Sequence, residues 1–185
     1  MPAPLLPKSE VVDRVMAVFR ERGFEGATLA RIAEATGLGK ASLYHYFPGG
    51  KEDMGNVVLD VTESWMQEHV LGPLGEETPP RQRIGRMLKS LDALYDGGNA
   101  ACLLGTLTVG DSRTLFRKRL QRIFDAWIDA LAGALRDAGS DRRAARERAE
   151  DTVARIEGAL ILAQARGDTG PFRRLLRQLG DELAP

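Results

Sequence analysis

Apolar side chains recur every three or four positions along most of the chain, which is the spacing of one face of an α-helix. Nothing in the sequence alternates convincingly between apolar and polar residues, as a half-buried strand does. The pattern therefore predicts an all-α protein. Glycine, proline and capping residues divide it into predicted helices over residues 9–22, 28–37, 40–46, 51–70, 84–95, 115–135, 141–166 and 171–183.

These predicted helices fall into two groups. Three short helices fill residues 1–50, whereas longer helices fill residues 51–185. The clearest linker lies inside the second group, from Gly72-Pro73 to Pro79-Pro80. We interpret the chain as a three-helix N-terminal domain, residues 1–50, followed by a helical-bundle domain, residues 51–185.

The overall composition does not indicate a function, but the charge of one segment does. With 43% hydrophobic and 28% charged residues, the chain can bury a core and is not a disordered tail. Its 26 basic and 26 acidic residues cancel, so the net charge gives no indication of a nucleic-acid partner. Residues 35–51 differ from this average, because they contain Lys40, His45 and Lys51 and no acidic residue.

Several function classes find no support in the sequence. The one cysteine, Cys102, cannot form an internal disulfide, which is typical of the reducing cytoplasm. No signal-peptide pattern begins the chain, and no apolar run approaches the ~20 residues of a membrane span. Two histidines and one cysteine, without metal-ligand spacing or a nucleophile motif, predict no catalytic residue, no metal and no cofactor. We therefore expect a cytoplasmic protein without a membrane partner.

The segment from Thr28 to Phe47 has the pattern of a helix-turn-helix. Thr28 is a candidate cap for the first of the two helices, and Gly37 permits the tight turn between them. Leu43 and Phe47 are expected on the inner side of the second helix. The polar groups left to face outward can bond phosphate oxygens or base edges, and they are Lys40, Ser42, His45 and the hydroxyls of Tyr44 and Tyr46.

This segment resembles the DNA-binding domain of the TetR/AcrR family of transcription regulators. The resemblance rests on the run Leu43-Tyr44-His45-Tyr46-Phe47 and on Lys51-Glu52-Asp53 after the turn. The turn Pro48-Gly49-Gly50 is one residue longer than the commonest family pattern. That length and the run Cys102-Leu103-Leu104-Gly105 resemble the LmrA/YxaF-like branch. The resemblance implies these DNA contacts: Thr28, Thr36, Lys40, Ala41, Ser42, Tyr44, His45 and Lys51.

The resemblance also implies a homodimeric repressor. Its partner is then a near-palindromic double-stranded operator, and a small lipophilic ligand releases it. Bulky apolar residues in the bundle are the candidates for a ligand pocket, although such residues at helical spacing are more often plain core. The candidates are Trp65, Met87, Leu91, Tyr95, Cys102, Phe116, Phe124 and Trp127.

The last two predicted helices resemble the pair that forms the dimer interface of the family. Their apolar residues repeat at intervals of three and four, and intrachain packing is the competing explanation. The candidate interface residues are Val153, Ile156, Leu160, Ala163, Phe172, Leu175 and Leu176.

Two other function classes compete with a repressor. An enzyme could use the same helical scaffold, but no catalytic constellation supports it. A helical adaptor could bind protein through its N-terminal domain, and the salt dependence of DNA binding distinguishes it from a repressor. Activation in place of repression depends on where the operator lies, which the protein sequence does not specify.

Overall fold

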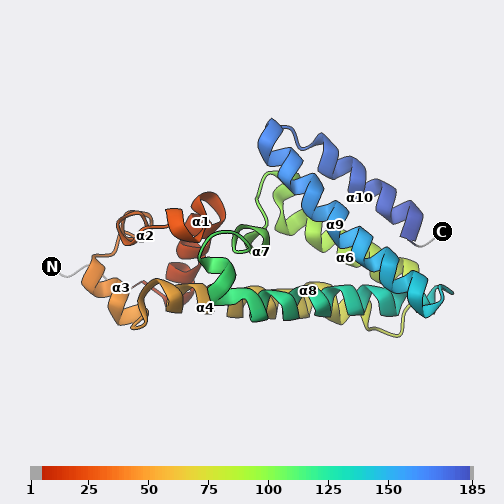
Figure 1. Ribbon diagram of the computed structural model, residues 1–185, viewed down its shortest axis with the longest axis horizontal. Helices are drawn as coiled ribbons and strands as arrows, with labels where there is room; N and C mark the ends of the chain where they lie inside the picture. Colours follow the sequence, from red (N-terminus) through yellow and green to blue (C-terminus); the bar gives the residue numbers. More distant parts are fainter. Residues whose placement is uncertain (1–5, 184–185) are drawn as a thin grey trace. The chain divides into compact units, whose positions relative to one another are not determined.

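The structure, a computed structural model, describes residues 6–183, and every regular element in that range is helical (Figure 1). The all-α prediction is therefore confirmed. The elements in chain order are α1 (Lys8–Gly26), α2 (Leu29–Thr36), α3 (Lys40–Tyr46), α4 (Gly50–Met66), the π-helical turn η1 (Gln67–Leu71), α5 (Gly72–Leu74), α6 (Pro80–Leu94), the 3₁₀ turn η2 (Asp96–Gly98), α7 (Leu103–Thr106), α8 (Ser112–Asp137), α9 (Arg142–Arg166) and α10 (Gly170–Leu183).

The largest difference from the expected boundaries lies after α4. The sequence predicted one helix to residue 70 and then a linker from Gly72 to Pro80. Instead, α4 ends at Met66, and helical turns continue through η1 and α5 as far as Leu74. Pro73 does not break this path, because it stands in the first turn of α5, where a missing backbone N–H costs nothing. The loop between helices is thereby reduced to residues 75–79.

The first compact unit combines the N-terminal helices with a segment from much later in the chain. It contains residues up to Thr62 together with Leu103–Arg117, so α7 and the start of α8 belong to it. Its interior includes Phe19, Phe24, Leu43, Phe47, Met54 and Phe116, all of them buried. An aromatic contact connects the two segments, because Phe24, which also packs against Phe19 within α1, packs against Phe116.

The second compact unit contains Glu63–Cys102 and the chain from Lys118 onward. Within it, α10 packs against α9 and α6, and α6 also packs against η1 and α5. The largest fully buried side chains include Trp127, Met87, Leu91 and Phe172. Between residues 6 and 183, no helix has both the length and the apolar character needed to cross a membrane.

Candidate functional site

Local capping holds the helix-turn-helix in shape. The Thr28 hydroxyl accepts a hydrogen bond from the Arg31 backbone N–H at 3.3 Å, which caps α2 as predicted. At the other end, Gly37 adopts φ 70°, a left-handed conformation that glycine takes without strain. Helix α3 begins at Lys40, three residues after Gly37. These contacts join residues close in sequence, so the segment itself determines the turn between α2 and α3.

The two faces of α3 differ sharply in burial. Leu43 is completely buried, and so is Phe47 at the end of the helix, as predicted. Lys40, Ala41 and His45 are exposed, and Ser42 is half-buried. Tyr44 keeps 48% of its surface exposed, although it is a large aromatic residue. The polar face of α3 is thus a surface of five residues, Lys40, Ala41, Ser42, Tyr44 and His45, which we call the α3 face.

Thr36 occupies a different place from the other predicted contacts. Its side chain is only 1% exposed, and its hydroxyl donates a hydrogen bond to the Ile32 carbonyl oxygen at 2.7 Å. Arg14, which the sequence analysis did not select, donates to the Thr36 and Ala35 carbonyl oxygens at 3.1 and 3.4 Å. The geometry therefore gives the Thr36 side chain a role in closing the end of α2 and not in direct DNA contact.

Lys51 is already engaged within the chain. Its ammonium donates to the Phe24 carbonyl oxygen at 2.9 Å and lies 4.4 Å from the centre of the Phe24 ring. The turn before it is closed by a hydrogen bond from the Gly50 N–H to the Phe47 carbonyl at 2.9 Å, with Gly50 at φ 68°. An ammonium has three donors, so Lys51 retains donors for a phosphate. Its predicted DNA contact stays a prediction.

Tyr46 likewise uses the hydroxyl that the sequence assigned to the outer surface. That hydroxyl donates to the Leu6 carbonyl oxygen at 2.6 Å, so it holds the chain before α1 beside the end of α3. The two residues are 40 positions apart in sequence, so the local pattern of apolar and polar residues did not reveal their hydrogen bond.

A carboxylate joins the two chain segments of the first unit. Glu25 accepts a hydrogen bond from the Ser112 N–H at the start of α8, at 3.1 Å. This bond is the main reason that the pKa of Glu25 lies below its ordinary value, and the nearby Lys51 charge lowers it further. The contact gives the first turn of α8 a negatively charged partner, which also suits the dipole of the helix.

Phe116 is separated from the other predicted pocket residues. It belongs to the first unit, where its ring meets the Phe24 ring edge-on at 5.4 Å between centroids. The close packing also explains Gly55, because a Cβ added there would lie 2.5 Å from the Phe116 ring. Phe116 is therefore core of the first unit, and the expectation that it lines a pocket in the bundle is corrected.

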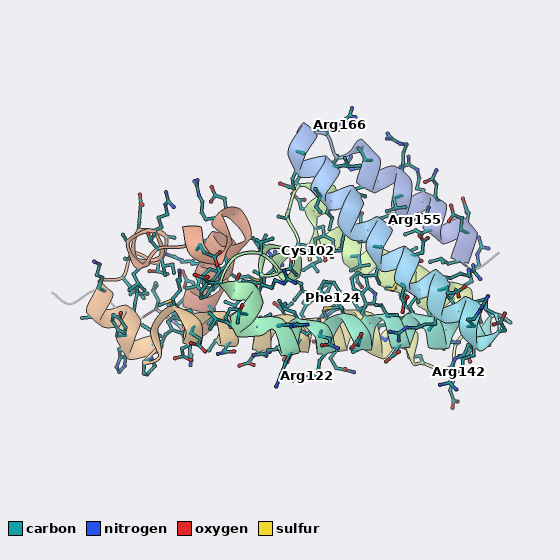
Figure 2. All side chains as sticks on the ribbon, in the orientation of Figure 1. Cys102, Arg122, Phe124, Arg142, Arg155 and Arg166 are labelled. Carbon is teal, nitrogen blue, oxygen red and sulfur yellow. The ribbon has the colours of Figure 1, made fainter. Side chains whose placement is uncertain are left out.

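The remaining predicted pocket residues lie in the second unit, where most are tightly packed. Met87, Leu91 and Trp127 are at most 1% exposed, and the Trp127 indole N–H donates to the Met87 sulfur at 3.5 Å. Trp65 is half-buried and stacks on His69, with 4.8 Å between ring centroids. In Figure 2, Phe124 lies on the side of α8 turned toward α9, whereas Arg122 points away from it. Met87, Leu91 and Trp127 are therefore part of the apolar interior of this unit.

Two hollows in this unit have other linings. One, of about 220 Å³, lies between the end of α4, η1 and α8 and is lined by Met66, Leu71 and Ile123 among others. The other, an open groove of about 700 Å³ between α6, η2 and α10, carries charges from Asp92, Asp96, Arg173 and Arg177. Neither hollow is lined by the predicted pocket residues. A ligand among those residues therefore requires the interior to repack.

Tyr95 and Cys102 form a polar group inside the second unit together with Glu157 from α9. The Tyr95 hydroxyl donates to the Cys102 sulfur at 3.4 Å, and both side chains are buried. The Cys102 thiol also hydrogen-bonds to the Glu157 carboxyl. Burial raises the pKa of Glu157 above its ordinary value, and the contact with Cys102 only partly opposes that shift. Glu157 was missed in the sequence, where it stands in a helix rich in surface charges.

The predicted dimer residues are used within the chain. Val153, Ile156, Leu160 and Ala163 on α9 and Phe172 and Leu175 on α10 are buried, and Leu176 is half-buried. Intrachain packing, the competing explanation, accounts for these positions. The opposite side of α9 instead exposes Ile161 and Leu162, with 67% and 53% of their surfaces accessible.

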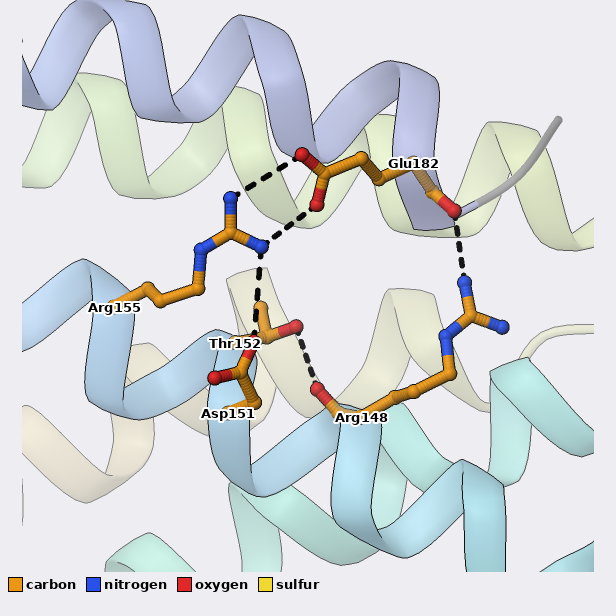
Figure 3. Close-up of polar contacts among 5 residues, drawn as sticks. All are labelled: Arg148, Asp151, Thr152, Arg155 and Glu182. Carbon is orange, nitrogen blue, oxygen red and sulfur yellow. Dashed lines mark hydrogen bonds and ion pairs between the residues drawn. The ribbon is translucent and has the colours of Figure 1, made fainter.

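Polar contacts lock α9 and α10 together (Figure 3). The Arg155 guanidinium holds the Glu182 carboxylate through two nitrogens, at 2.7 and 3.3 Å, and also lies 3.7 Å from Asp151. Arg148 donates to the Glu182 backbone carbonyl at 2.8 Å. These contacts raise the pKa of Arg155 and lower that of Glu182, chiefly through their shared hydrogen bonds. Two helices fixed in this way present one defined outer surface.

The geometry of a helix-turn-helix followed by a helical bundle agrees with the comparisons to known families. Residues 11–56 match the family described as bacterial regulatory proteins, tetR family. Residues 80–178, more than half of the chain, match the C-terminal domain of LmrA/YxaF-like transcriptional regulators. The chain therefore belongs to the LmrA/YxaF-like branch of the TetR family and is a DNA-binding transcription regulator.

Individual relatives agree with this assignment. The repressor DhaR of Mycobacterium sp. (strain GP1) is 27% identical over 186 residues, covering 96% of this chain and 92% of DhaR. A TetR regulator from Legionella pneumophila has the same fold, with a TM-score of 0.82 at 21% identity over 99% of this chain and 100% of that one. The structure of Bacillus subtilis FadR in complex with stearoyl-CoA is similar at a TM-score of 0.72, with 17% identity and 96% and 98% of the two chains covered.

Proposed function

We propose that this regulator is a homodimeric repressor that binds a near-palindromic operator through the α3 face and leaves it when a small lipophilic effector binds the second unit. The observation that carries the proposal is the α3 face itself. Lys40, Tyr44 and His45 are exposed on this helix, and the buried Leu43 and Phe47 anchor it. A helix of this kind fits the major groove, where its side chains reach base edges and phosphates.

The residues of the α3 face have distinct expected roles. Lys40 can bond the O6 and N7 acceptors of guanine, and the small Ala41 suits contact with a thymine methyl group. The Tyr44 hydroxyl and His45 are better placed for phosphates, together with the donors that Lys51 retains. Thr28, at the start of α2, completes the set with a side chain that already caps its own helix.

DNA binding is tested by fluorescence anisotropy with duplex DNA from the region flanking the protein's own gene, at several salt concentrations. Affinity is expected to fall linearly on a logarithmic scale as salt rises, because bound phosphates release counterions. Lys40→Ala is expected to weaken binding by about 1–3 kcal/mol for each half-site. Lys89→Ala, which removes an exposed lysine from α6, is the matched control and is expected to bind normally.

Tyr44→Ala separates phosphate contact from base reading. It is expected to weaken binding to specific and unrelated duplexes alike, whereas Lys40→Ala reduces the preference for the specific duplex. If both variants bind as tightly as the unmodified protein, with the same salt dependence, the α3 face is not the DNA-binding surface. A partner protein in place of DNA would then be the better reading of this unit.

Dimerisation is assigned to the outer side of α9. Ile161 and Leu162 are exposed there, and Gly158 has open space around its Cα, so a second helix can approach closely. The contacts of Arg155 and Arg148 with α10 keep this surface in one arrangement. Two copies joined here can present two recognition helices to successive major grooves, as a near-palindromic operator requires.

Light-scattering chromatography tests the dimer. Leu162→Asp is expected to convert the dimer into monomers and to reduce operator affinity, because single half-sites bind weakly. Val109→Asp introduces the same charge at a residue that is 60% exposed in the first unit, and it is expected to leave the dimer intact. A Leu162→Asp protein that remains dimeric would place the interface elsewhere.

The effector part of the proposal rests on the apolar interior of the second unit. Met87 and its neighbours can repack around a ligand, since methionine side chains adapt easily. The related fold of FadR supports this, because that protein was determined in complex with stearoyl-CoA. The test titrates a neutral aromatic alcohol, 1-naphthylmethanol, against the operator complex. Release of DNA supports a lipophilic effector, and unchanged binding up to the solubility limit contradicts it.

A further inference from the structure

One buried carboxylate oxygen in the second unit has no hydrogen-bond donor among the described residues. Glu157 Oε1 is buried and accepts no hydrogen bond from any residue of the described chain, 6–183. A buried acceptor without a donor costs about 1–3 kcal/mol, and more when the group is charged. Such atoms are rare in native proteins, and a bound group that supplies the missing donor is one physical explanation.

The surroundings of Glu157 define what could supply that donor. The Cys102 thiol hydrogen-bonds to the carboxyl and itself receives the Tyr95 hydroxyl at 3.4 Å. The Tyr95 ring packs edge-on against Phe172, with centroids 5.9 Å apart. The carboxyl therefore contacts a thiol that in turn contacts a phenol, and no basic side chain contributes to its ionisation. Most buried carboxylates are paired with a positive charge, but among residues 6–183 none contributes to the ionisation of this one.

A cationic donor satisfies this site better than a neutral one. An ammonium forms a charge-assisted hydrogen bond to a carboxylate, roughly twice as strong as a neutral hydrogen bond, and it balances the buried charge. Such a pairing would also offset the burial that raises the pKa of Glu157. An anionic ligand would meet repulsion from the same carboxylate.

We propose that Glu157, flanked by Cys102 and Tyr95, is the polar anchor of the effector site and selects a lipophilic amine in its protonated form. This inference rests on the proposed function, because it names the chemical class of the effector. The aromatic part of the amine lies in the apolar interior, and its ammonium bonds Glu157 Oε1. Tyr95 and Cys102 hold the carboxyl in position for this bond.

The test compares two probes that differ in charge and hardly in shape, 1-naphthylmethylamine and 1-naphthylmethanol. Their affinities for the full-length protein are measured by calorimetry at pH 7, where the amine is protonated. We expect the amine to bind at least about ten-fold more tightly than the alcohol, a preference equivalent to about 1.4 kcal/mol. In Glu157→Gln, which keeps the size of the side chain, that preference is expected to disappear while the alcohol binds as before.

Glu147→Gln is the matched control. It makes the same change on the same helix, but Glu147 is exposed and pairs with Arg143 along the helix surface. This variant is expected to keep the full preference for the amine. A preference that survives in Glu157→Gln, or is lost equally in Glu147→Gln, overturns the proposal. Failure of both probes to bind, or stronger binding of the alcohol, also overturns it.

Operator binding without any probe separates this inference from the function on which it rests. If the protein binds its operator and the amine is not preferred, only the role of Glu157 fails. If the amine binds through Glu157 but does not release the operator, the anchor stands and the proposed response to effectors fails. If the operator is not bound at all, the repressor assignment fails, whatever the probes do.

Discussion

The α3 face carries its polar groups on the surface, whereas the second unit carries Tyr95, Cys102 and Glu157 inside. Lys40 and His45 are exposed, so water can satisfy their hydrogen bonds when no partner is bound. Glu157 Oε1 has no such substitute, because it is sealed from solvent. Exposed polar groups can be substituted with little effect on folding. Substitution of buried polar groups is expected to alter both stability and any binding that involves them.

The largest expected effect lies in the interior of the second unit. Trp127→Ala removes a completely buried indole and is expected to lower the free energy of unfolding by about 3–5 kcal/mol. Urea denaturation followed by circular dichroism measures it, with the exposed Leu115→Ala as the control. A loss below about 1 kcal/mol would mean that the interior around Trp127 closes easily. That outcome would favour a readily repacked effector site.

The next prediction concerns the apolar interior of the first unit. A change in its packing is expected to affect stability, as a change in the interior of the second unit does. Gly55→Ala places a methyl group 2.5 Å from the Phe116 ring and is expected to cost about 1–3 kcal/mol through overpacking. Gly85→Ala is the control, because a Cβ at that helical glycine meets nothing within 4 Å. Thermal unfolding compares the two. Equal melting temperatures would show that Phe116 moves aside freely.

The third prediction has the opposite sign. Glu157→Gln is expected to stabilise the protein at pH 7 by on the order of 1 kcal/mol, since a neutral amide replaces a carboxyl that burial disfavours when charged. Because the folded-state pKa is raised above the ordinary value of 4.5, the unmodified protein loses stability as pH rises from about 4.5 through that higher pKa.

The stability difference between Glu157→Gln and the unmodified protein should therefore grow over this pH range and vanish below it. Urea denaturation at a series of pH values between 4 and 8 tests it, with Glu147→Gln as the comparison. A difference that is independent of pH would show that ionisation of Glu157 does not enter the folding equilibrium.

The smallest expected effect on stability belongs to the α3 face. Lys40→Ala changes an exposed side chain and is expected to shift the free energy of unfolding by less than about 0.5 kcal/mol, although it reduces DNA binding. Parallel denaturation and anisotropy measurements on one preparation check this separation. A large destabilisation would contradict the difference between the two regions, because it would show that Lys40 also stabilises the folded protein.

Sequence reasoning succeeded where a structure depends on neighbours along the chain. The caps at Thr28 and Gly37 and the burial of Leu43 follow from contacts over three or four residues, so the pattern alone predicts them. The ends of α9 and α10 were predicted for the same reason, since Asp141 caps α9 and Gly167 ends it.

Long-range packing explains what sequence reasoning did not predict. Phe116 reads as one more apolar residue of a long helix, and only its contact with Phe24, 92 positions earlier, assigns it to the first unit. Glu157 stands among surface charges in the sequence, but in the fold it is largely buried and hydrogen-bonds to Cys102, 55 positions earlier. Thr36 looks exposed in a polar turn, but the pattern does not reveal that its hydroxyl bonds back to Ile32.

The return of Leu103–Arg117 to the N-terminal helices has a consequence for protein engineering. The simplest chimeric regulator fuses the N-terminal domain of one parent to the C-terminal domain of another at a single junction. Here a junction after residue 62 would remove Phe116 from Phe24 and Ser112 from Glu25. A working chimera would have to exchange residues up to Thr62 and Leu103–Arg117 together, because both segments build the first unit.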